Sequence, residues 1–205
     1  SNEHRHVIAT SGNHEVIGKL LRREAKRLKI TDADQKIAVA DGAEWIRKQL
    51  KSKLPMLDNQ ILDFYHLSEH VWATANICFN QGSDKAKEFA SEILHIAKHE
   101  GPTVLLSRLI DERKKYRSKA KRKSLEELIK YITHRFKMCD YPKFIEQGWQ
   151  IGSGPTEAMC KVLTYRLKGA GMRWDRPGAD AIMALIALEQ SNTWKSYWEL
   201  RKRAA

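Results

Sequence analysis

Apolar positions in the first third of the chain predict a small sheet with one intervening helix. After its lysine, the segment 36–40 is a continuous run of small apolar side chains, which is typical of a strand buried on both faces. Residues 60–64 form the next predicted strand, and residues 44–50 between them have the periodicity of a helix. Two strands joined by a helix of this length pair in parallel through a right-handed crossover.

The N-terminal residues predict one more strand and one more helix. Residues 6–10 are β-prone and end at a polar turn. Asn13 is placed to cap a helix that runs to about residue 29, with valine, isoleucine and leucine on one face. The expected sheet therefore has about three strands.

From residue 66 onward the apolar positions repeat with the period of α-helices, and no further strand is predicted. A glycine-containing loop is expected over 140–153. The predicted helices span 66–81, 84–100, 102–117, 121–139, 155–168 and 177–190, followed by a short one that carries Trp194, Tyr197 and Trp198. The predicted fold class is α/β in front and all-helical behind, in segments 1–65, 66–150 and 151–205.

Composition excludes several classes of protein. The 205 residues are 42% hydrophobic and 30% charged, which suits a globular chain with a real core. No apolar run is long enough to span a membrane, and no signal-peptide core is present, so we expect a cytoplasmic protein without a membrane partner. The cysteines, Cys78, Cys139 and Cys160, form no CxxC pair, which argues against a zinc knuckle or a disulfide framework.

The net charge of +12 and the pI near 9.6 indicate a polyanionic partner, with nucleic acid favoured over a membrane surface. A basic protein without such a partner is the alternative. The basic residues concentrate in two blocks. The first contains Arg108, Arg113, Lys114, Lys115, Arg117, Lys119, Lys121, Arg122 and Lys123, and the second contains Lys161, Arg166, Lys168, Arg173 and Arg176.

Three acidic residues are placed where chemistry is common. Asp41 follows the strand 36–40, at the edge where open parallel sheets bind ligands, although capping of the next helix would also explain it. Asp63 closes the next strand. Glu157 falls at the third position of a helix behind a glycine-rich loop, where the helix dipole alone would stabilise a carboxylate.

Histidine spacing offers a rival hypothesis. His66, Glu69 and His70 match the H-x-x-E-H pattern of inverted zinc peptidases, in which two histidines bind zinc and the glutamate is the base. Simple hydrogen bonding at a helix start is the other explanation. His95 and His99 are also four residues apart, and we interpret them as surface or core histidines.

Four segments together resemble the transposases of bacterial insertion sequences, of the DDE class and its Mutator-like branch. Their order and spacing match along nearly the whole chain. The segments are Asp41-Gly42-Ala43-Glu44-Trp45-Ile46, Ile61-Leu62-Asp63-Phe64-Tyr65-His66-Leu67-Ser68-Glu69-His70-Val71-Trp72, Ile151-Gly152-Ser153-Gly154-Pro155-Thr156-Glu157 and Arg166-Leu167-Lys168-Gly169-Ala170-Gly171-Met172-Arg173-Trp174. The resemblance implies an RNase-H-like sheet, with a helical insertion before the helix that carries the last acid.

In that family three carboxylates hold two Mg²⁺ (or Mn²⁺) ions for DNA strand cleavage and transfer. Only the twenty-one residues from Gly42 to Leu62 separate Asp41 from Asp63, too few for the strands that lie between the first two acids. The resemblance therefore makes Asp41 the second acid and Glu157 the third, both metal ligands. Asp63 and His66 match the supporting (Cys/Asp)-x-x-His motif.

The first acid would then lie upstream of residue 6, and we expect this chain alone to be inactive. The strand 36–40 would also have a free edge, which we expect to be covered by strand rearrangement or by a second chain. A DNA-binding remnant or regulator without catalysis is the second hypothesis, and the zinc peptidase is the third.

The resemblance implies double-stranded DNA, at transposon ends and target, as the partner of a homo-oligomer in the bacterial nucleoid. Trp174 would stack on a flipped base, or else serve as an ordinary core residue. The residues expected to contact DNA are Lys114, Lys115, Arg117, Lys121, Arg122, Lys123, Arg166, Lys168, Arg173 and Trp174.

Overall fold

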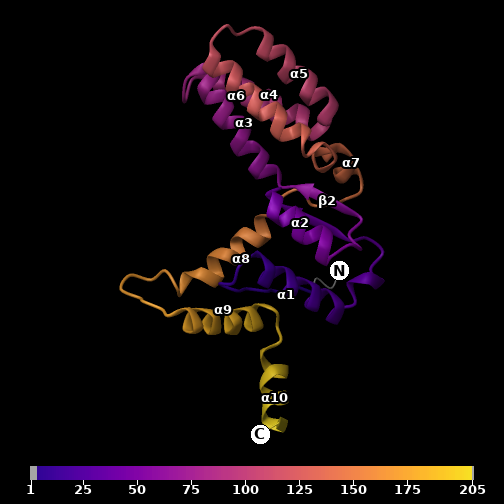
Figure 1. Cartoon of the computed structure of the whole chain (residues 1–205), viewed down its shortest axis with the longest axis vertical. Helices are drawn as coiled ribbons and strands as arrows, with labels where there is room; N and C mark the ends of the chain where they lie inside the picture. Colours follow the sequence, from indigo (N-terminus) through magenta and orange to yellow (C-terminus); the bar gives the residue numbers. More distant parts are fainter. Residues whose placement is uncertain (1–3, 205) are drawn as a thin grey trace. The chain divides into compact units, whose positions relative to one another are not determined.

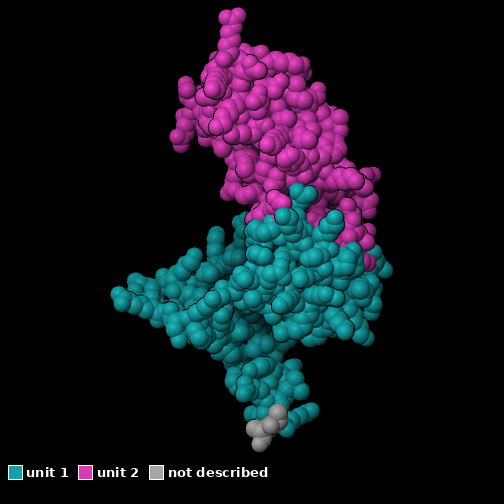
Figure 2. Space-filling view, viewed as in Figure 1, with its two compact units in different colours: residues 1–34, 45–56, 154–205 teal, residues 35–44, 57–153 magenta. Residues whose placement is uncertain are grey.

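The computed structural model describes residues 4–204, and most of the chain is helical (Figure 1). Two compact units are formed, and each is built from discontinuous stretches of sequence (Figure 2). Unit 1 contains residues 4–34, 45–56 and 154–204, and unit 2 contains residues 35–44 and 57–153. The first and last parts of the chain thus fold together, while both strands belong with the long helical segment.

The sheet of unit 2 has two strands, β1 (Ile37–Ala40) and β2 (Asn59–Leu62). They pair in parallel, with Ile37 opposite Asn59 and Ala40 opposite Leu62, which confirms the predicted parallel pairing. The chain between them contains the predicted helix, α2 (Glu44–Lys53). The resulting small sheet with many helices is compatible with the α/β class that we predicted.

The long helices of unit 2 follow the predicted periodicity closely. Helix α3 packs against α4 and α6, and α5 packs against α4 and α6, around a core of fully buried leucine, isoleucine, valine and alanine side chains. Their bounds are α3 (Phe64–Phe79), α4 (Asp84–His99), α5 (Pro102–Lys114) and α6 (Lys119–Thr133). Within the predicted helix 121–139, the last turn is instead the 3-10 helix η2 (Phe136–Cys139).

The predicted loop over 140–153 contains a short helix, α7 (Tyr141–Glu146), so that part of the prediction is wrong. Pro142 suggested a break, but it lies in the first turn of α7, where a missing backbone N–H costs nothing. The helix is held in place because Tyr141 and Phe144 are fully buried, and the Tyr141 hydroxyl donates to the Leu62 carbonyl at 3.0 Å.

Unit 1 contains four of the labelled helices and most of α2. Asn13 caps α1 (His14–Arg27) as predicted, because its side chain accepts hydrogen bonds from the backbone N–H groups of Glu15 and Val16. A 3-10 turn, η1 (Ile30–Asp32), follows α1. The C-terminal helices are α8 (Gly154–Tyr165), α9 (Arg176–Gln190) and α10 (Trp194–Ala204).

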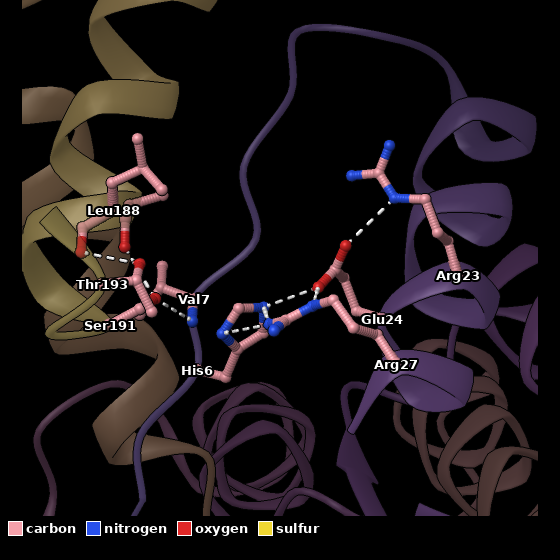
Figure 3. A network of polar contacts seen from close by, with 9 residues as sticks. His6, Val7, Arg23, Glu24, Arg27, Leu188, Ser191 and Thr193 are labelled. Atoms are coloured by element: carbon pink, nitrogen blue, oxygen red, sulfur yellow. Dashed lines mark hydrogen bonds and ion pairs between the residues drawn. The ribbon is translucent and has the colours of Figure 1, made fainter. Parts of the chain in front are cut away.

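The predicted strand 6–10 does not form, so the prediction of about three strands is wrong. Its backbone N–H groups bond to side chains instead of to a neighbouring strand: the Val7 N–H donates to the Ser191 hydroxyl at 2.9 Å (Figure 3). Just beyond this segment, the Ser11 N–H donates to Asp180 at 2.6 Å. The His6 ring also bonds the Glu24 carboxylate at 3.0 Å. Tertiary contacts thus override the β-prone composition of this segment.

No strand pairs with the other edge of β1 among residues 4–204. The expected strand rearrangement is therefore not seen in this part of the chain. The side chains of β1 are all half-buried, unlike those of Ile61 and Leu62 in β2, which are fully buried. Within the described residues, no helix is long and apolar enough to cross a membrane.

Candidate functional site

The carboxyl end of β1 presents Asp41 to solvent. Asp41 directly follows the strand, and its Oδ1 accepts the backbone N–H of Ala43 at 2.8 Å. Among the contacts within residues 4–204, this is the one hydrogen bond that the carboxylate makes. The bond to Ala43 agrees with the alternative that Asp41 caps the next helix. It also leaves the second carboxylate oxygen of Asp41 open to a ligand.

The turn after Asp41 is held by Arg135, which lies two residues beyond the end of α6. Gly42 has a φ of 74°, and its carbonyl oxygen accepts hydrogen bonds from the Nε and Nη2 atoms of Arg135, at 3.1 and 2.9 Å. A Cβ atom at residue 42 would lie 2.7 Å from Arg135 Nε and from Leu62 Cδ1. Only glycine therefore permits both this backbone conformation and this close approach.

Asp63, at the carboxyl end of β2, is buried and fully engaged. Its Oδ1 accepts the Tyr65 N–H at 2.8 Å and caps α3, while its Oδ2 accepts the Ser153 N–H at 3.2 Å and the Ser153 hydroxyl. The Phe64 N–H donates to the Ile151 carbonyl at 2.9 Å in the same region. Asp63 therefore fastens the glycine-rich loop that precedes α8 to the end of β2.

His66 and His70 of α3, Tyr131 of α6 and Arg135 just after α6 form a stack of side chains, which we call the aromatic column. The rings of His66 and His70 meet edge to face at 5.2 Å, and His70 lies 4.0 Å from Tyr131. The Arg135 guanidinium lies 3.9 Å from the centre of the Tyr131 ring. The Tyr131 hydroxyl donates to the Asp41 carbonyl at 3.3 Å. Two members of the column, Tyr131 and Arg135, therefore hydrogen-bond to the turn after β1.

Two ionisable groups of the aromatic column are shifted toward their neutral forms. Burial, followed by the positive charges of His66 and Arg135, lowers the pKa of His70. Burial also raises the pKa of Tyr131 to about 12. At neutral pH the column therefore supplies a neutral ring, a hydroxyl donor and one permanent cation next to Asp41.

Metal-binding groups do not gather in one place. Residues 4–204 contain no cluster of three His, Cys, Asp or Glu side chains that could hold an ion. In the H-x-x-E-H segment, Glu69 binds the Nδ1 of His66 at 3.0 Å, and His70 stacks on Tyr131. At the carboxyl ends of β1 and β2, Asp41 is exposed and Asp63 is buried, so the strand ends offer one open carboxylate, which is fewer than a two-metal site needs.

Glu157 belongs to unit 1, where it lies in the first turn of α8 and is exposed. It follows Ser153 by four residues, directly after the loop that Asp63 holds. The structure thus brings the predicted residues Asp41, Asp63 and His66 together in unit 2 and places Glu157 in the other unit.

The first basic block lies on α5 and α6, and much of its charge is compensated. Lys114 pairs with Asp111 at 2.8 Å, Lys115 with Glu112 at 2.8 Å and Lys123 with Glu127 at 3.8 Å. The Lys121 ammonium donates to the carbonyl of Cys78 and lies 5.1 Å from the centre of the Tyr116 ring.

Arg117 and Arg122 differ from the other members of the first block. Both are exposed, and neither has an acidic partner within the described part of the chain. Of this predicted contact surface, these two guanidiniums are the groups most open to a phosphate.

The second basic block surrounds the connection between α8 and α9. Arg166, Lys168 and Arg173 are exposed there, and no acidic side chain pairs with them in the range 4–204. Trp174 is 42% exposed, which disagrees with a core role for this ring. Together they present three cations and one aromatic face to solvent in the loop that Figure 1 shows between α8 and α9.

Sequence reasoning missed Arg135, Tyr131 and Ser153. Tyr131 lies in the last turn of α6 and Arg135 just after it, and both lie about ninety residues from the turn that they hold. Ser153 lies inside the glycine-rich motif. Its hydroxyl, a hydrogen-bond donor, is the feature of the sequence that could have indicated a contact between this loop and a carboxylate.

Comparison of the chain with models of known protein families, with curated proteins and with solved structures gave no match. The resemblance to insertion-sequence transposases therefore depends on the motifs of this chain's own sequence.

Proposed function

We propose that this chain is a DNA-binding part of a transposase and that duplex DNA lies across its exposed basic residues. The observation that carries the proposal is the α8–α9 loop, in which Arg166, Lys168 and Arg173 are exposed without acidic partners among residues 4–204. Such cations bind phosphate oxygens and release condensed counterions, which stabilises the complex and makes it sensitive to salt.

The order of chemical groups along the chain supports the transposase part of the proposal. Asp41 and Asp63 follow neighbouring parallel strands, a long helical segment comes after β2, and Glu157 begins the next helix. This order agrees with the RNase-H-like catalytic region that the resemblance implies, in which Asp41 and Glu157 would be ligands of Mg²⁺ or Mn²⁺.

The hydrogen bonds of Asp63 favour a different role for that residue. Because both of its oxygens accept bonds from Tyr65 and Ser153, Asp63 is a positioning residue for the loop before Glu157. His66 belongs to the aromatic column, which braces the turn that carries Asp41. In this proposal Asp41 and Glu157 are the acids that would bind the metal ions. Asp63 and His66 are positioning residues for the loop before Glu157 and for the turn that carries Asp41.

Fluorescence anisotropy with a labelled DNA duplex tests the binding. The variant R166E/R173E is expected to weaken binding and to flatten its salt dependence, since each lost phosphate contact reduces the slope of log K against log salt by about 0.9. The matched control is K85E/K87E, which makes the same change in net charge at exposed lysines at the start of α4. Equal weakening by both variants would reduce the proposal to nonspecific attraction.

A nicking assay with Mn²⁺ separates the transposase from a DNA-binding regulator. We expect no nicking by this chain alone, and nicking once an upstream segment with a further acid is joined to it. That activity should disappear in D41N and in E157Q. Duplex binding without any nicking by the extended protein would select the regulator, while nicking that survives both substitutions would overturn the assignment of these acids.

A further inference from the structure

Helix α10 carries an aromatic stripe that the rest of unit 1 does not cover. Trp194, Tyr197, Trp198 and Arg201 recur at positions i, i+3, i+4 and i+7, so they share one face of the helix. None of the side chains from 194 to 203 is buried; Trp194 is 42% exposed and Trp198 is 41% exposed. Exposed aromatic groups in such density mark an interaction surface.

The rings of this stripe hold one another in place. Trp194 meets Trp198 at a centroid distance of 5.7 Å and an angle of 69°, and Tyr197 meets Trp198 at 5.2 Å and 81°. Arg201 donates to the Tyr197 hydroxyl at 3.1 Å and lies 6.0 Å from the centre of its ring. These edge-to-face contacts order the rings in advance while leaving ring surface open to a planar ligand.

A cleft at the junction of α9 and α10 continues the stripe. It has a volume of about 530 Å³, with an apolar wall made by Ile182, Leu185 and Ile186. Arg166, Trp194 and Lys195 also line it, and Glu189 is the one acidic group at its rim. The cleft therefore combines an apolar floor with two cations and the first ring of the stripe.

Charge decides which partner suits this surface. Helix α10 carries Lys195, Arg201, Lys202 and Arg203 against Glu199, in a chain of net charge +12. Two copies of the helix would repel each other, so an anionic partner is favoured. A membrane surface suits it less well, because the helix has 11 residues and its large apolar side chains are confined to this stripe and Leu200.

We propose that α10 and the adjoining cleft bind an unpaired nucleic-acid strand. Bases stack on Trp194 and Trp198, and phosphates meet Lys195, Arg201 and Arg166, the pairing of aromatic platforms with cations that single strands require. Base faces are accessible in a single strand and closed within a duplex, so the aromatic stripe serves the single strand, while Arg166 is shared with the duplex-binding surface. The inference goes beyond the proposed function and holds whether or not Asp41 and Glu157 support cleavage.

The test is the affinity of the full chain for a labelled oligothymidylate strand and for a duplex of equal length. In W194A/W198A we expect strand affinity to fall about fivefold to 150-fold for each stack that is lost. W194F/W198F keeps stacking surfaces and should retain most of the affinity, which guards against a merely unfolded α10. The matched control is W72A, since Trp72 is 37% exposed on α3 in unit 2.

Duplex affinity should change little in W194A/W198A, so failure here is distinguishable from failure of the duplex-binding proposal. Unchanged strand binding in W194A/W198A, or an equal loss in W72A, would overturn the inference. Two further measurements identify another partner. If W194A/W198A binds the strand normally but no longer binds phosphatidylserine vesicles, or no longer self-associates in sedimentation, α10 binds a membrane or a second copy of the chain and the inference is wrong.

Discussion

Arg135 donates two hydrogen bonds to the carbonyl oxygen of Gly42, at 2.9 and 3.1 Å, across 93 positions of the sequence. The contact joins the segment between α6 and η2 to the turn after β1. Because the Arg135 guanidinium also lies over the Tyr131 ring, one side chain fixes both the aromatic column and the backbone of Asp41. The Asp41 side chain stays exposed while its backbone is held.

Replacement of Arg135 with methionine is expected to lower the free energy of unfolding by about 1–3 kcal/mol, because the Gly42 carbonyl loses a charged donor in a partly buried turn. Urea titration monitored by circular dichroism measures the change. The control is Arg122→Met, at an exposed arginine without an acidic partner among residues 4–204, for which we expect about 0.5 kcal/mol or less. Equal effects would show that the turn does not depend on Arg135.

Replacement of Asp63 should lower the free energy of unfolding more than replacement of Asp41. Asp63→Ala removes the cap of α3 and both bonds to Ser153, so we expect a loss of about 2–4 kcal/mol. Asp41→Ala removes one bond to the Ala43 N–H and should cost about 1 kcal/mol. Thermal unfolding of the two variants provides the comparison, and a larger loss for Asp41 would contradict the positioning role of Asp63.

Stability should fall in acid because of His70. Its pKa is lowered in the folded protein, first by burial and then by the charges of His66 and Arg135, whereas Glu69 acts in the opposite direction. As the pH decreases through the ordinary value of 6.5, the unfolded chain takes up the proton first, so unfolding becomes easier until the folded group also titrates.

His70→Phe keeps a ring against Tyr131 and should remove this part of the pH dependence, as measured by urea unfolding at pH values on either side of 6.5. His99→Phe, on the exposed end of α4, is the control and should leave the dependence unchanged. A His70→Phe protein with the original pH profile would assign the acid sensitivity to other groups.

Lys121 and Arg122 are neighbours on α6, but we expect the first to affect stability and the second to affect duplex binding. Lys121→Ala removes the donor to the Cys78 carbonyl and is expected to lower the free energy of unfolding by about 1 kcal/mol, with little effect on duplex affinity. Arg122→Ala should leave stability unchanged and weaken duplex binding, with a salt slope smaller by about 0.9. Fluorescence anisotropy and thermal unfolding of both variants measure these effects. Weaker duplex binding by Lys121→Ala than by Arg122→Ala would make Lys121 the DNA contact and contradict the prediction.

Local periodicity was enough to predict most of the helices and the parallel pair of strands. The apolar repeats that build α3–α6 continue through each helix, and the apolar run before Asp41 correctly indicated a strand, although its side chains are half-buried and not buried on both faces. The segment 6–10 and α7 were mispredicted because their states depend on partners far along the chain, such as Ser191 for Val7 and Leu62 for Tyr141.

The candidate site was predictable only at the level of residue type and position. Strand ends placed Asp41 and Asp63 correctly at one edge of the sheet, since parallel neighbours end on the same side. Nothing local shows that Ser153 saturates the Asp63 carboxylate or that Arg135 reaches Gly42, because those pairs are 90 and 93 positions apart.

The discontinuous make-up of the two units sets the order in which they are completed during synthesis. All residues of unit 2 have left the ribosome once residue 153 has emerged, so its four-helix core can close early. Unit 1 needs residues 154–204 to join 4–34 and 45–56, and the backbone N–H groups of Val7 and Ser11 must wait for Ser191 and Asp180. Until then unit 1 is incomplete, which exposes the nascent chain to misfolding during the last quarter of its synthesis.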